Sequence, residues 1–220
     1  MNRTLGIIPA RAGSRRLPGK NLRPLGGRPL IDWTLDAAEA SDLDRLVLSS
    51  DDPTVLARAV DRPRLLALSR PAALAGDAVR NVEVMRQVLH DLAEPFDFAV
   101  LLQPTSPFRT AADINAAIDQ CRRTGADACI SVCVPEKPAH WLQQAEGERL
   151  SPLLANDPGR VFLPNGAVYV IRVERLLAGA DFHSTPPCWI TMPRARSVDI
   201  DDAGDLALAE WLCTRRQEET

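Results

Sequence analysis

Residues 5–21 read LGIIPARAGSRRLPGKN, a short apolar segment followed at once by a basic, glycine-containing loop. The apolar part, Leu5–Pro9, has the length of a buried β-strand. The loop contains no acidic residue, and its cations are Arg11, Arg15, Arg16 and Lys20. A strand that runs directly into such a loop is typical of open α/β sheets, in which ligands bind at the carboxyl ends of the strands.

Short apolar runs continue to alternate with amphipathic segments along the chain, which predicts a mostly parallel sheet covered by helices. Further strands are expected at Arg45–Ser49, Leu65–Leu68, Phe96–Leu102, Ala128–Val134 and Ala167–Ile171. One helix is expected to have Pro29 in its first turn, and another to follow a capping-box pattern at Thr110 and Asp113. A third is indicated by an apolar stripe from Val82 to Leu92. The remaining helices are expected at Thr54–Val60, Val173–Leu177 and Asp202–Arg215. Between the last two strands, Pro135–Gly159 has little periodicity and is interpreted as an arm or a substrate-closing excursion.

Composition restricts the class of protein. A length of 220 residues with 45% apolar and 25% charged residues fits one globular domain. The formal net charge of -3 gives no general attraction for a nucleic-acid backbone, so no nucleic-acid partner is expected. The first apolar stretch is too short for a signal peptide and no run reaches membrane-spanning length, which predicts a cytoplasmic protein without a membrane partner. The five cysteines contain no CxxC pair and are expected to be buried free thiols.

The loop from Pro9 to Asn21 suits a triphosphate. Glycines let backbone N–H groups approach phosphate oxygens, and side-chain cations offset the charge of a polyanion. It is not a Walker A loop, because five residues rather than four separate Gly13 from Gly19, and Asn21 stands where a magnesium-binding Ser or Thr belongs. A flexible basic connection would have a similar composition, but the position at a strand end favours a ligand site.

Two further polar segments follow predicted strands and should converge with this loop: SSDD at residues 49–52 and QPTSP at residues 103–107. The second segment offers neutral donors and acceptors for a hydroxyl-rich or carboxylate-bearing substrate, from Gln103, Thr105 and Ser106. Its two prolines restrict the backbone. Both aspartates of the first segment are interpreted as N-caps of the next helix rather than as catalytic groups.

The segment SVDIDD near the C-terminus contains a candidate metal site. In an extended chain alternate residues share a face, so Asp199 and Asp201 should point together while the isoleucine between them packs the other way. Such a pair of carboxylates suits Mg²⁺, which a nucleotidyl transfer uses to neutralise pyrophosphate. The alternative is that the acids only begin the last helix. We adopt that interpretation for Asp202 and Asp205. For Asp199 and Asp201, metal binding and the start of the helix both stay open.

Four segments, in chain order, resemble motifs of the acylneuraminate cytidylyltransferase (CMP-sialic acid synthetase) family: IIPARAGSRRLPGKN, LLQPTSPFRT, PNGAVYV and SVDIDD. Arg70-Pro71 with Leu74 and Asp77 is similar to a further segment of that family. The resemblance implies a Rossmann-like, three-layer α/β sandwich with a mostly parallel sheet, of the nucleotide-diphospho-sugar transferase type. It implies one domain over residues 1–220 with a small dimerisation excursion at about residues 135–165.

The resemblance also implies a homodimer and a reaction in which CTP and a nonulosonic acid give the CMP-sugar and pyrophosphate. Arg11 and Lys20 would bind and stabilise the triphosphate, and Asn21 would lie beside the reacting phosphate. Arg70 and the region around Asn81 would hold the nucleoside.

Further roles follow from the same resemblance. Gln103 would contact the sugar acid, and Asp199 and Asp201 would ligate Mg²⁺. The remaining residues expected to bind substrate are Ala10, Ala12, Gly13, Thr105, Ser106, Arg160 and Asn165.

One segment departs from the family pattern. Members commonly carry an Arg-Gln pair and further basic residues before the NGA(I/V)Y segment, whereas this chain has NDPGRVF at residues 156–162, with Arg160 as the candidate replacement. The sequence leaves open which group accepts the proton of the sugar hydroxyl. It also leaves open which sugar acid is the substrate: N-acetylneuraminate, legionaminate, pseudaminate or a related acid. The alternatives are a cytidylyltransferase for another sugar acid such as Kdo, a transferase for a simple sugar phosphate, and a non-catalytic nucleotide-binding protein of the same fold.

Overall fold

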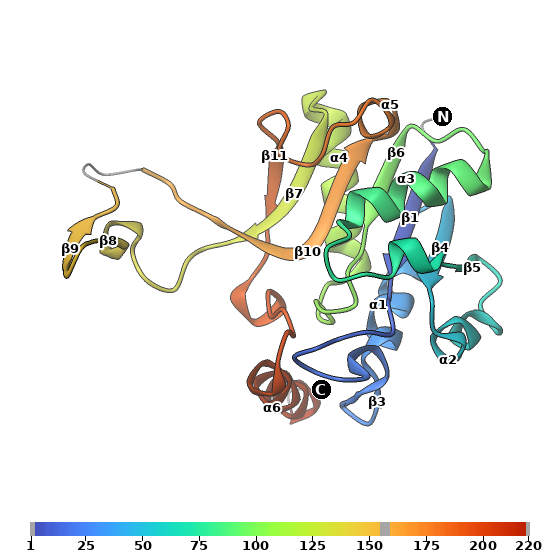
Figure 1. Cartoon of the computed structure of the whole chain (residues 1–220), viewed down its shortest axis with the longest axis horizontal. Helices are drawn as coiled ribbons and strands as arrows, with labels where there is room; N and C mark the ends of the chain where they lie inside the picture. The colour runs from blue at the N-terminus through green and yellow to red at the C-terminus, as the bar shows by residue number, and fades with distance from the viewer. Residues whose placement is uncertain (1–2, 155–158, 219–220) are drawn as a thin grey trace.

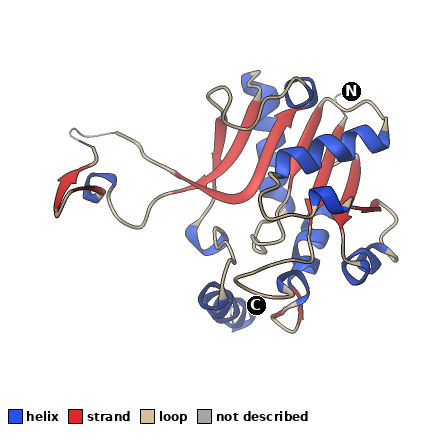
Figure 2. Cartoon of the chain, viewed as in Figure 1, coloured by secondary structure: helices blue, strands red, loops and turns tan. Residues whose placement is uncertain are grey.

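A seven-stranded sheet forms the centre of the computed structural model, which describes residues 3–154 and 159–218 (Figures 1 and 2). The strand order is β11-β7-β10-β6-β1-β4-β5. The strands are β1 (Thr4–Pro9), β4 (Arg45–Ser50), β5 (Leu65–Ser69), β6 (Phe98–Leu101), β7 (Ala128–Cys133), β10 (Leu163–Arg172) and β11 (Cys188–Thr191). All run parallel except β10, which pairs antiparallel with both β6 and β7. The predicted mostly parallel sheet is confirmed.

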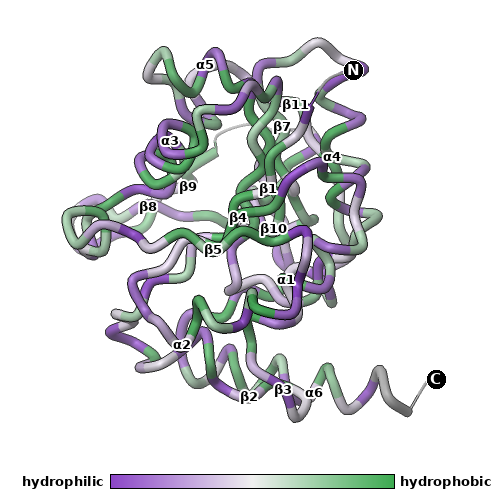
Figure 3. Tube along the Cα trace, turned by 90° about the vertical axis from the view of Figure 1, so that its right-hand side faces the viewer, coloured by the Kyte–Doolittle hydropathy of each residue, from purple (hydrophilic) through white to green (hydrophobic). Residues whose placement is uncertain are grey.

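Helices cover both faces of this sheet. They are α1 (Leu30–Glu39), α2 (Pro53–Leu56), α3 (Asn81–Leu92), α4 (Ala111–Thr124) and α5 (Val173–Leu177), and a further helix, α6 (Ala203–Glu218), lies beyond the sheet. One apolar cluster joins α1 and α4 to one face, and a second joins α3 and α5 to the other. Alternate residues of β1 serve the two clusters, since Ile7 packs towards α3 and Ile8 towards α1. Figure 3 accordingly shows the central strands as the most continuous hydrophobic part of the chain.

A third apolar cluster lies beyond the sheet and joins α6 to the loop after β1. It contains Leu17 from that loop, Leu30 at the start of α1, Ile200, and Ala209 and Cys213 from α6. The basic loop is therefore held by apolar packing and is not a free connection.

Several predicted element ends were wrong. β6 occupies Phe98–Leu101, inside the predicted Phe96–Leu102. β10 begins at Leu163, before the predicted Ala167, and an irregular register that interrupts its pairing with β7 hid its first part from the sequence pattern. β11 was not predicted, because this edge strand exposes alternate residues such as Trp189 and its apolar run, residues 188–190, is only three residues long.

The helix starts also differ in detail. Pro29 is the N-cap of α1 rather than a residue of its first turn. The helix predicted at Thr54–Val60 is the short α2, Pro53–Leu56, followed by a 3-10 turn at Ala57–Ala59. The predicted capping box at Thr110 and Asp113 is confirmed.

Residues 134–154 and 159–162 lie outside the sheet between β7 and β10, and they are called the arm. This arm carries the hairpin of β8 (Gln143–Glu146) and β9 (Arg149–Pro152), which extends away from the body (Figure 1). The excursion predicted at about residues 135–165 ends earlier, since β10 starts at Leu163. Residues 155–158 lie outside the described residues, and the last three of them begin the segment that departs from the family pattern.

The remaining elements are short. β2 (Pro24–Leu25) and β3 (Arg28–Pro29) form a two-stranded ribbon. Further 3-10 turns are at Lys20–Leu22, Ala72–Leu74, Ala139–Trp141 and Arg194–Arg196. All five cysteines are free, and three of them are buried. Among the described residues, no helix is both long and apolar enough to span a membrane.

The capping box gives a first prediction. Thr110 Oγ1 accepts from Asp113 N at 3.3 Å, and Asp113 Oδ2 accepts from Thr110 N at 2.9 Å. We expect Thr110→Ala to lower the free energy of unfolding by about 1 kcal/mol in urea titrations, because it leaves an N-terminal amide unsatisfied. Thr124→Ala, at the other end of α4, is the control and should cost clearly less. Equal losses would contradict the capping role.

Candidate active site

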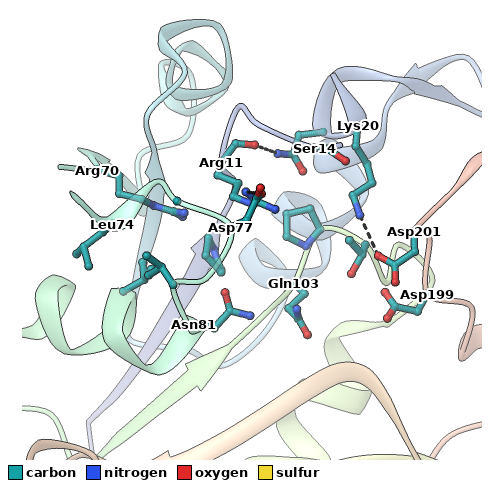
Figure 4. Close-up of a pocket in the computed structure, with 17 residues that line it drawn as sticks. Arg11, Ser14, Lys20, Arg70, Leu74, Asp77, Asn81, Gln103, Asp199 and Asp201 are labelled. Atoms are coloured by element: carbon teal, nitrogen blue, oxygen red, sulfur yellow. Dashed lines mark hydrogen bonds and ion pairs between the residues drawn. The ribbon is translucent and has the colours of Figure 1, made fainter. Parts of the chain in front are cut away.

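A cavity of about 310 Å³ opens at the carboxyl ends of β1 and β6 (Figure 4). From these two neighbouring strands the chain continues in opposite directions along the sheet, from β1 to β4 and from β6 to β7, and open α/β folds bind ligands where the strand order reverses in this way. Nine of the predicted site residues line this cavity: Arg11, Lys20, Asn21, Arg70, Asn81, Gln103, Thr105, Asp199 and Asp201. Segments far apart in the sequence therefore converge as expected.

The SSDD segment, which ends β4 and begins the turn after it, supports the basic loop and does not line the cavity. Ala10 N donates to Ser49 O at 2.9 Å, and Ser50 Oγ donates to Ala10 O at 2.5 Å. Asp51 Oδ1 accepts from Ala12 N at 2.9 Å, so the prediction that Asp51 caps the next helix was wrong. Only its neighbour, Asp52, caps α2.

The aspartate pair has the predicted alternation. Asp199 and Asp201 both face the cavity, while Ile200 is fully buried in the third apolar cluster. Ile200 N donates to Thr105 O at 2.7 Å. Lys20 Nζ donates to Ile200 O at 2.9 Å and to Asp201 Oδ1 at 3.2 Å, which ties the basic loop to the acidic segment.

The two acids following this pair begin the last helix, as predicted. Asp202 Oδ1 accepts from Gly204 N at 2.8 Å and from Asp205 N at 3.0 Å. Asp205 Oδ2 in turn accepts from the amides of Asp201 and Asp202. These bonds satisfy amides at the N-terminus of α6.

The environments of the paired carboxylates differ. Burial raises the pKa of Asp199 above its ordinary value, and the charge of Asp201 acts in the same direction. A hydrogen bond with Thr105 and the charge of Lys20 oppose this rise without cancelling it. Burial would also raise the pKa of Asp201, but hydrogen bonds and charges from Lys20 and Arg16 hold it below its usual range. Two neighbouring carboxylates, one of them disfavoured in its ionised form, suit a divalent cation.

Gly166 leaves the space that Asp199 occupies. Its φ is +75°, and a Cβ built there would lie 3.2 Å from Asp199 Oδ2. A side chain at this position would therefore strain the backbone and press on the carboxylate. The NGAVYV segment of β10 thus helps to place the acidic pair.

Asp77 was not among the predicted site residues, although it lines the cavity and pairs with both Arg11 and Arg15. The hydrogen bond from Arg11, the larger cause, and the charge of Arg15 hold the pKa of Asp77 below its ordinary value. Arg16 and Lys20 pair in the same way with Asp201. All four cations of the loop thus have carboxylate partners, which an incoming polyanion would have to replace.

Arg70 and Asn81 form another wall of the cavity. Arg70 is 7% exposed, and its Nη2 donates to Ser49 O at 2.8 Å. Burial, followed by the charge of Arg11, lowers the pKa of Arg70 below its usual value, although Asp51 opposes this. The same wall includes the apolar side chains of Leu74 and Val79, which were not predicted.

A second cavity, of about 230 Å³, adjoins the first through Asn81 and Gln103. Tyr169 of β10 and Phe182 line it, with ring centroids 4.9 Å apart. Its rim includes Arg80, Asp181 and His183. Sequence reasoning missed this cavity, whose only signal was the tyrosine of the PNGAVYV motif.

The other predicted substrate-binding residues do not line either cavity. Ala10 is buried beneath the loop, whereas Ala12 and Gly13 lie exposed in it. The Ser106 side chain is fully buried, and its Oγ has no hydrogen-bond partner among the described residues. Arg160 lies over the Phe162 ring, 5.3 Å from its centroid. The predicted substrate contacts of these residues stay predictions.

Asn165 also lies outside both cavities, and its amide joins three segments of the fold. Its Oδ1 accepts from Ser131 Oγ at 2.6 Å, and its Nδ2 donates to Ser197 Oγ at 2.8 Å. This 5% exposed side chain links β7, β10 and the segment that follows the Arg194–Arg196 turn and leads to the acidic pair.

The family follows from sequence comparison. A family model described as "Cytidylyltransferase" matches residues 5–148, well over half of the chain. The chain belongs to the cytidylyltransferase family. Its basic loop, the Arg70 wall and the QPTSP turn all fall within the matched region, whereas the Asp199/Asp201 pair lies beyond it.

Relatives of this cytidylyltransferase use several nonulosonic acids. It is 32% identical over 229 residues to a CMP-N,N'-diacetyllegionaminic acid synthase of Legionella pneumophila, with 98% of each chain covered. It is 29% identical to an N-acylneuraminate cytidylyltransferase of Escherichia coli, covering 93% of this chain and 51% of that protein. A pseudaminic acid cytidylyltransferase of Campylobacter jejuni is 25% identical, with 96% of each chain covered.

Solved structures confirm the fold of the cytidylyltransferase. A 4-diphosphocytidyl-2C-methyl-D-erythritol synthase from Anaerococcus prevotii superposes with a TM-score of 0.74 at 15% identity, covering 97% of both chains. A CMP:2-keto-3-deoxy-manno-octonic acid synthetase complexed with CTP gives a TM-score of 0.69 at 18% identity, covering 99% of this chain and all of the other.

The internal pairing of the cations gives a second prediction. Asp77→Asn should bind inorganic pyrophosphate roughly two- to tenfold more tightly in calorimetry, because the ligand no longer has to replace the exposed ion pairs that Asp77 makes with Arg11 and Arg15. Asp91→Asn on α3, which removes the same charge outside the cavity, is the control and should bind like the wild type. Unchanged or weaker binding by Asp77→Asn would show that Asp77 orients Arg11 rather than competing with the anion.

Proposed function

We propose that this cytidylyltransferase transfers CMP from CTP to the anomeric hydroxyl of a nonulosonic acid and releases pyrophosphate. The observation that carries the proposal is the lining of one cavity by the loop cations Arg11 and Lys20, the Asp199/Asp201 pair and Gln103. The second cavity continues from Gln103 and offers space for a sugar. The relatives that activate legionaminic, neuraminic and pseudaminic acids support this substrate class.

The nucleotide would occupy the first cavity. Its triphosphate would replace Asp77 on Arg11 and Arg15, where charged oxygens of the same kind already bind. The nucleoside would lie against the Arg70 wall, where Asn81 supplies hydrogen-bonding groups and Leu74 an apolar surface.

The aspartate pair fits a magnesium ion. Asp199 and Asp201 face the same space. Among the described residues, no three or more His, Cys, Asp or Glu side chains form a cluster that could hold a metal. Two carboxylates completed by phosphate oxygens and water are the usual donors for Mg²⁺. The ion, when bound, would supply positive charge that stabilises the pyrophosphate leaving group.

The chain's own residues then orient the reaction. The sugar hydroxyl would attack the α-phosphorus in line with the departing pyrophosphate. Lys20 and Arg11 would stabilise the negative charge that accumulates on the phosphate oxygens, at positions fixed before the reaction starts. Asn21 holds the Arg11 backbone through an Nδ2 hydrogen bond of 2.9 Å to Arg11 O.

The second cavity favours an N-acylated sugar over Kdo. Its walls combine the rings of Tyr169 and Phe182 with Val82 and Leu101, an apolar surface suited to the methyl group of an acylamino substituent. Arg80 and the other polar groups of the rim could meet hydroxyl and carbonyl oxygens. Kdo has no acylamino group to fill such a surface.

The arm supports a homodimer, which is part of this proposal. Four large apolar side chains on or beside its hairpin are at least half exposed: Trp141, Leu142, Leu150 and Leu153. Pairing with the same surface of a second copy would bury them. The cytoplasmic location stays a prediction.

The proposed reaction is tested by pyrophosphate release with each of the four NTPs, Mg²⁺, and a panel of nonulosonic acids with Kdo. We expect turnover with CTP and a nonulosonic acid. Asp201→Asn should lower turnover at least roughly 100-fold because a charge-stabilising group is lost. Asp202→Asn, at the adjacent helix cap, is the control and should keep most of its activity. No turnover with CTP and any nonulosonic acid would refute the proposal, and an active Asp201→Asn variant would remove this residue from the metal site.

The dimer is tested by light scattering on a sizing column. The wild type should have twice the 24.0 kDa mass of one chain. Leu150→Glu should shift it towards the monomer, because Leu150 is 72% exposed on the arm and would be buried between copies. Val60→Glu changes an equally exposed apolar residue on the body and should leave the dimer intact. A monomeric wild type, or an unaffected Leu150→Glu variant, would contradict arm-mediated pairing.

A further inference from the structure

Arg109 has no predicted role, yet its guanidinium is enclosed beside the site. The residue is 3% exposed. Its Nε donates to Ala167 O at 2.7 Å and its Nη1 to Thr34 Oγ1 at 2.7 Å, while Nη2 donates to Gln103 O. One planar group thus joins β10, α1 and the end of β6.

Two of these acceptors belong together in the sheet. The antiparallel register of β6 and β10 ends at the pair Leu101–Tyr169. If this register continued by two residues on each strand, Gln103 would lie opposite Ala167. Arg109 donates to both of these carbonyls, so it bridges the two strands where their ladder has stopped.

The burial of this cation carries a cost. None of its three acceptors is a carboxylate. Burial lowers the pKa of Arg109 to about 9, although the charges of Asp199 and Asp113 act against this. A neutral or apolar link would avoid the desolvation penalty of a buried charge. What a guanidinium offers instead is a rigid, planar set of donors that fixes several acceptors in one geometry.

We propose that Arg109 is a positioning residue that fixes the spacing between Gln103 and Tyr169, and so the fit of the sugar acid between them. The inference rests on the proposed function, because these two residues line the second cavity. The nucleotide-binding groups Arg11 and Lys20 lie on a different loop, and Arg109 donates no hydrogen bond to that loop in the described residues. Gln103 lines both cavities whereas Tyr169 lines only the second, so Arg109 affects the sugar acid more than CTP.

The test compares the two substrates in one variant. Arg109→Lys keeps the charge but loses the planar donor set. We expect kcat/KM for the sugar acid to fall roughly 10- to 100-fold, mainly through KM, since small misplacements of substrate are costly. The KM for CTP should stay within about twofold. Arg109→Gln, which buries no charge and keeps a planar amide, serves as a second variant should Arg109→Lys fail to fold.

Thr34→Val is the matched control. It removes the third acceptor of the same guanidinium, on the α1 side and away from both cavities. It should lower the melting temperature and leave both KM values unchanged. A sugar-selective loss in Thr34→Val would overturn the inference, because the effect would then not depend on the strand-bridging bonds.

A double-mutant cycle with Gln103→Ala separates positioning from general damage. If Arg109 acts through Gln103, Arg109→Lys adds less loss to Gln103→Ala than it causes alone. Fully additive losses, or equal losses for CTP and the sugar acid, would overturn the inference while leaving the proposed function standing. A wild type inactive with CTP and every nonulosonic acid would overturn both.

Discussion

Ile200 packs in one apolar cluster with Leu17, while its amide donates to Thr105 O and its carbonyl accepts from Lys20 Nζ. Three segments that carry chemistry are thus tied together through one buried residue. Because alternate residues of an extended chain face opposite ways, burying Ile200 directs Asp199 and Asp201 into the cavity. The apolar contact thereby sets where the charged groups lie.

Charge balance within the cavity follows from this arrangement. The structure gathers the loop cations at one place, where their mutual repulsion would be costly without counter-charges. Asp77 and Asp201 provide those charges, each pairing with two cations. A nucleotide with a metal ion brings the same combination of negative and positive charge. Binding can therefore exchange one set of ion pairs for another without leaving the cations unpaired.

The sequence allowed much of this site to be predicted, because its motifs follow strand ends and alternate residues share a face. It could not show which groups meet through long-range contacts. Asp77 reaches Arg11 from a distant segment. The rings of Tyr169 and Phe182 meet only because the chain turns back after β10 and α5. β11 escaped prediction for a related reason, since an edge strand is defined by its neighbour rather than by its own pattern.

The proposed reaction requires this cavity to direct the anomeric oxygen of a sugar acid onto the α-phosphorus of CTP. It is tested most directly by a single turnover with a nonulosonic acid that carries ¹⁸O in its anomeric hydroxyl, followed by mass spectrometry of the products. The label should appear in the bridging oxygen of the CMP-sugar, with unlabelled pyrophosphate. A CMP-sugar without the label, or label in the pyrophosphate, would show that the sugar hydroxyl is not the nucleophile and would contradict this account.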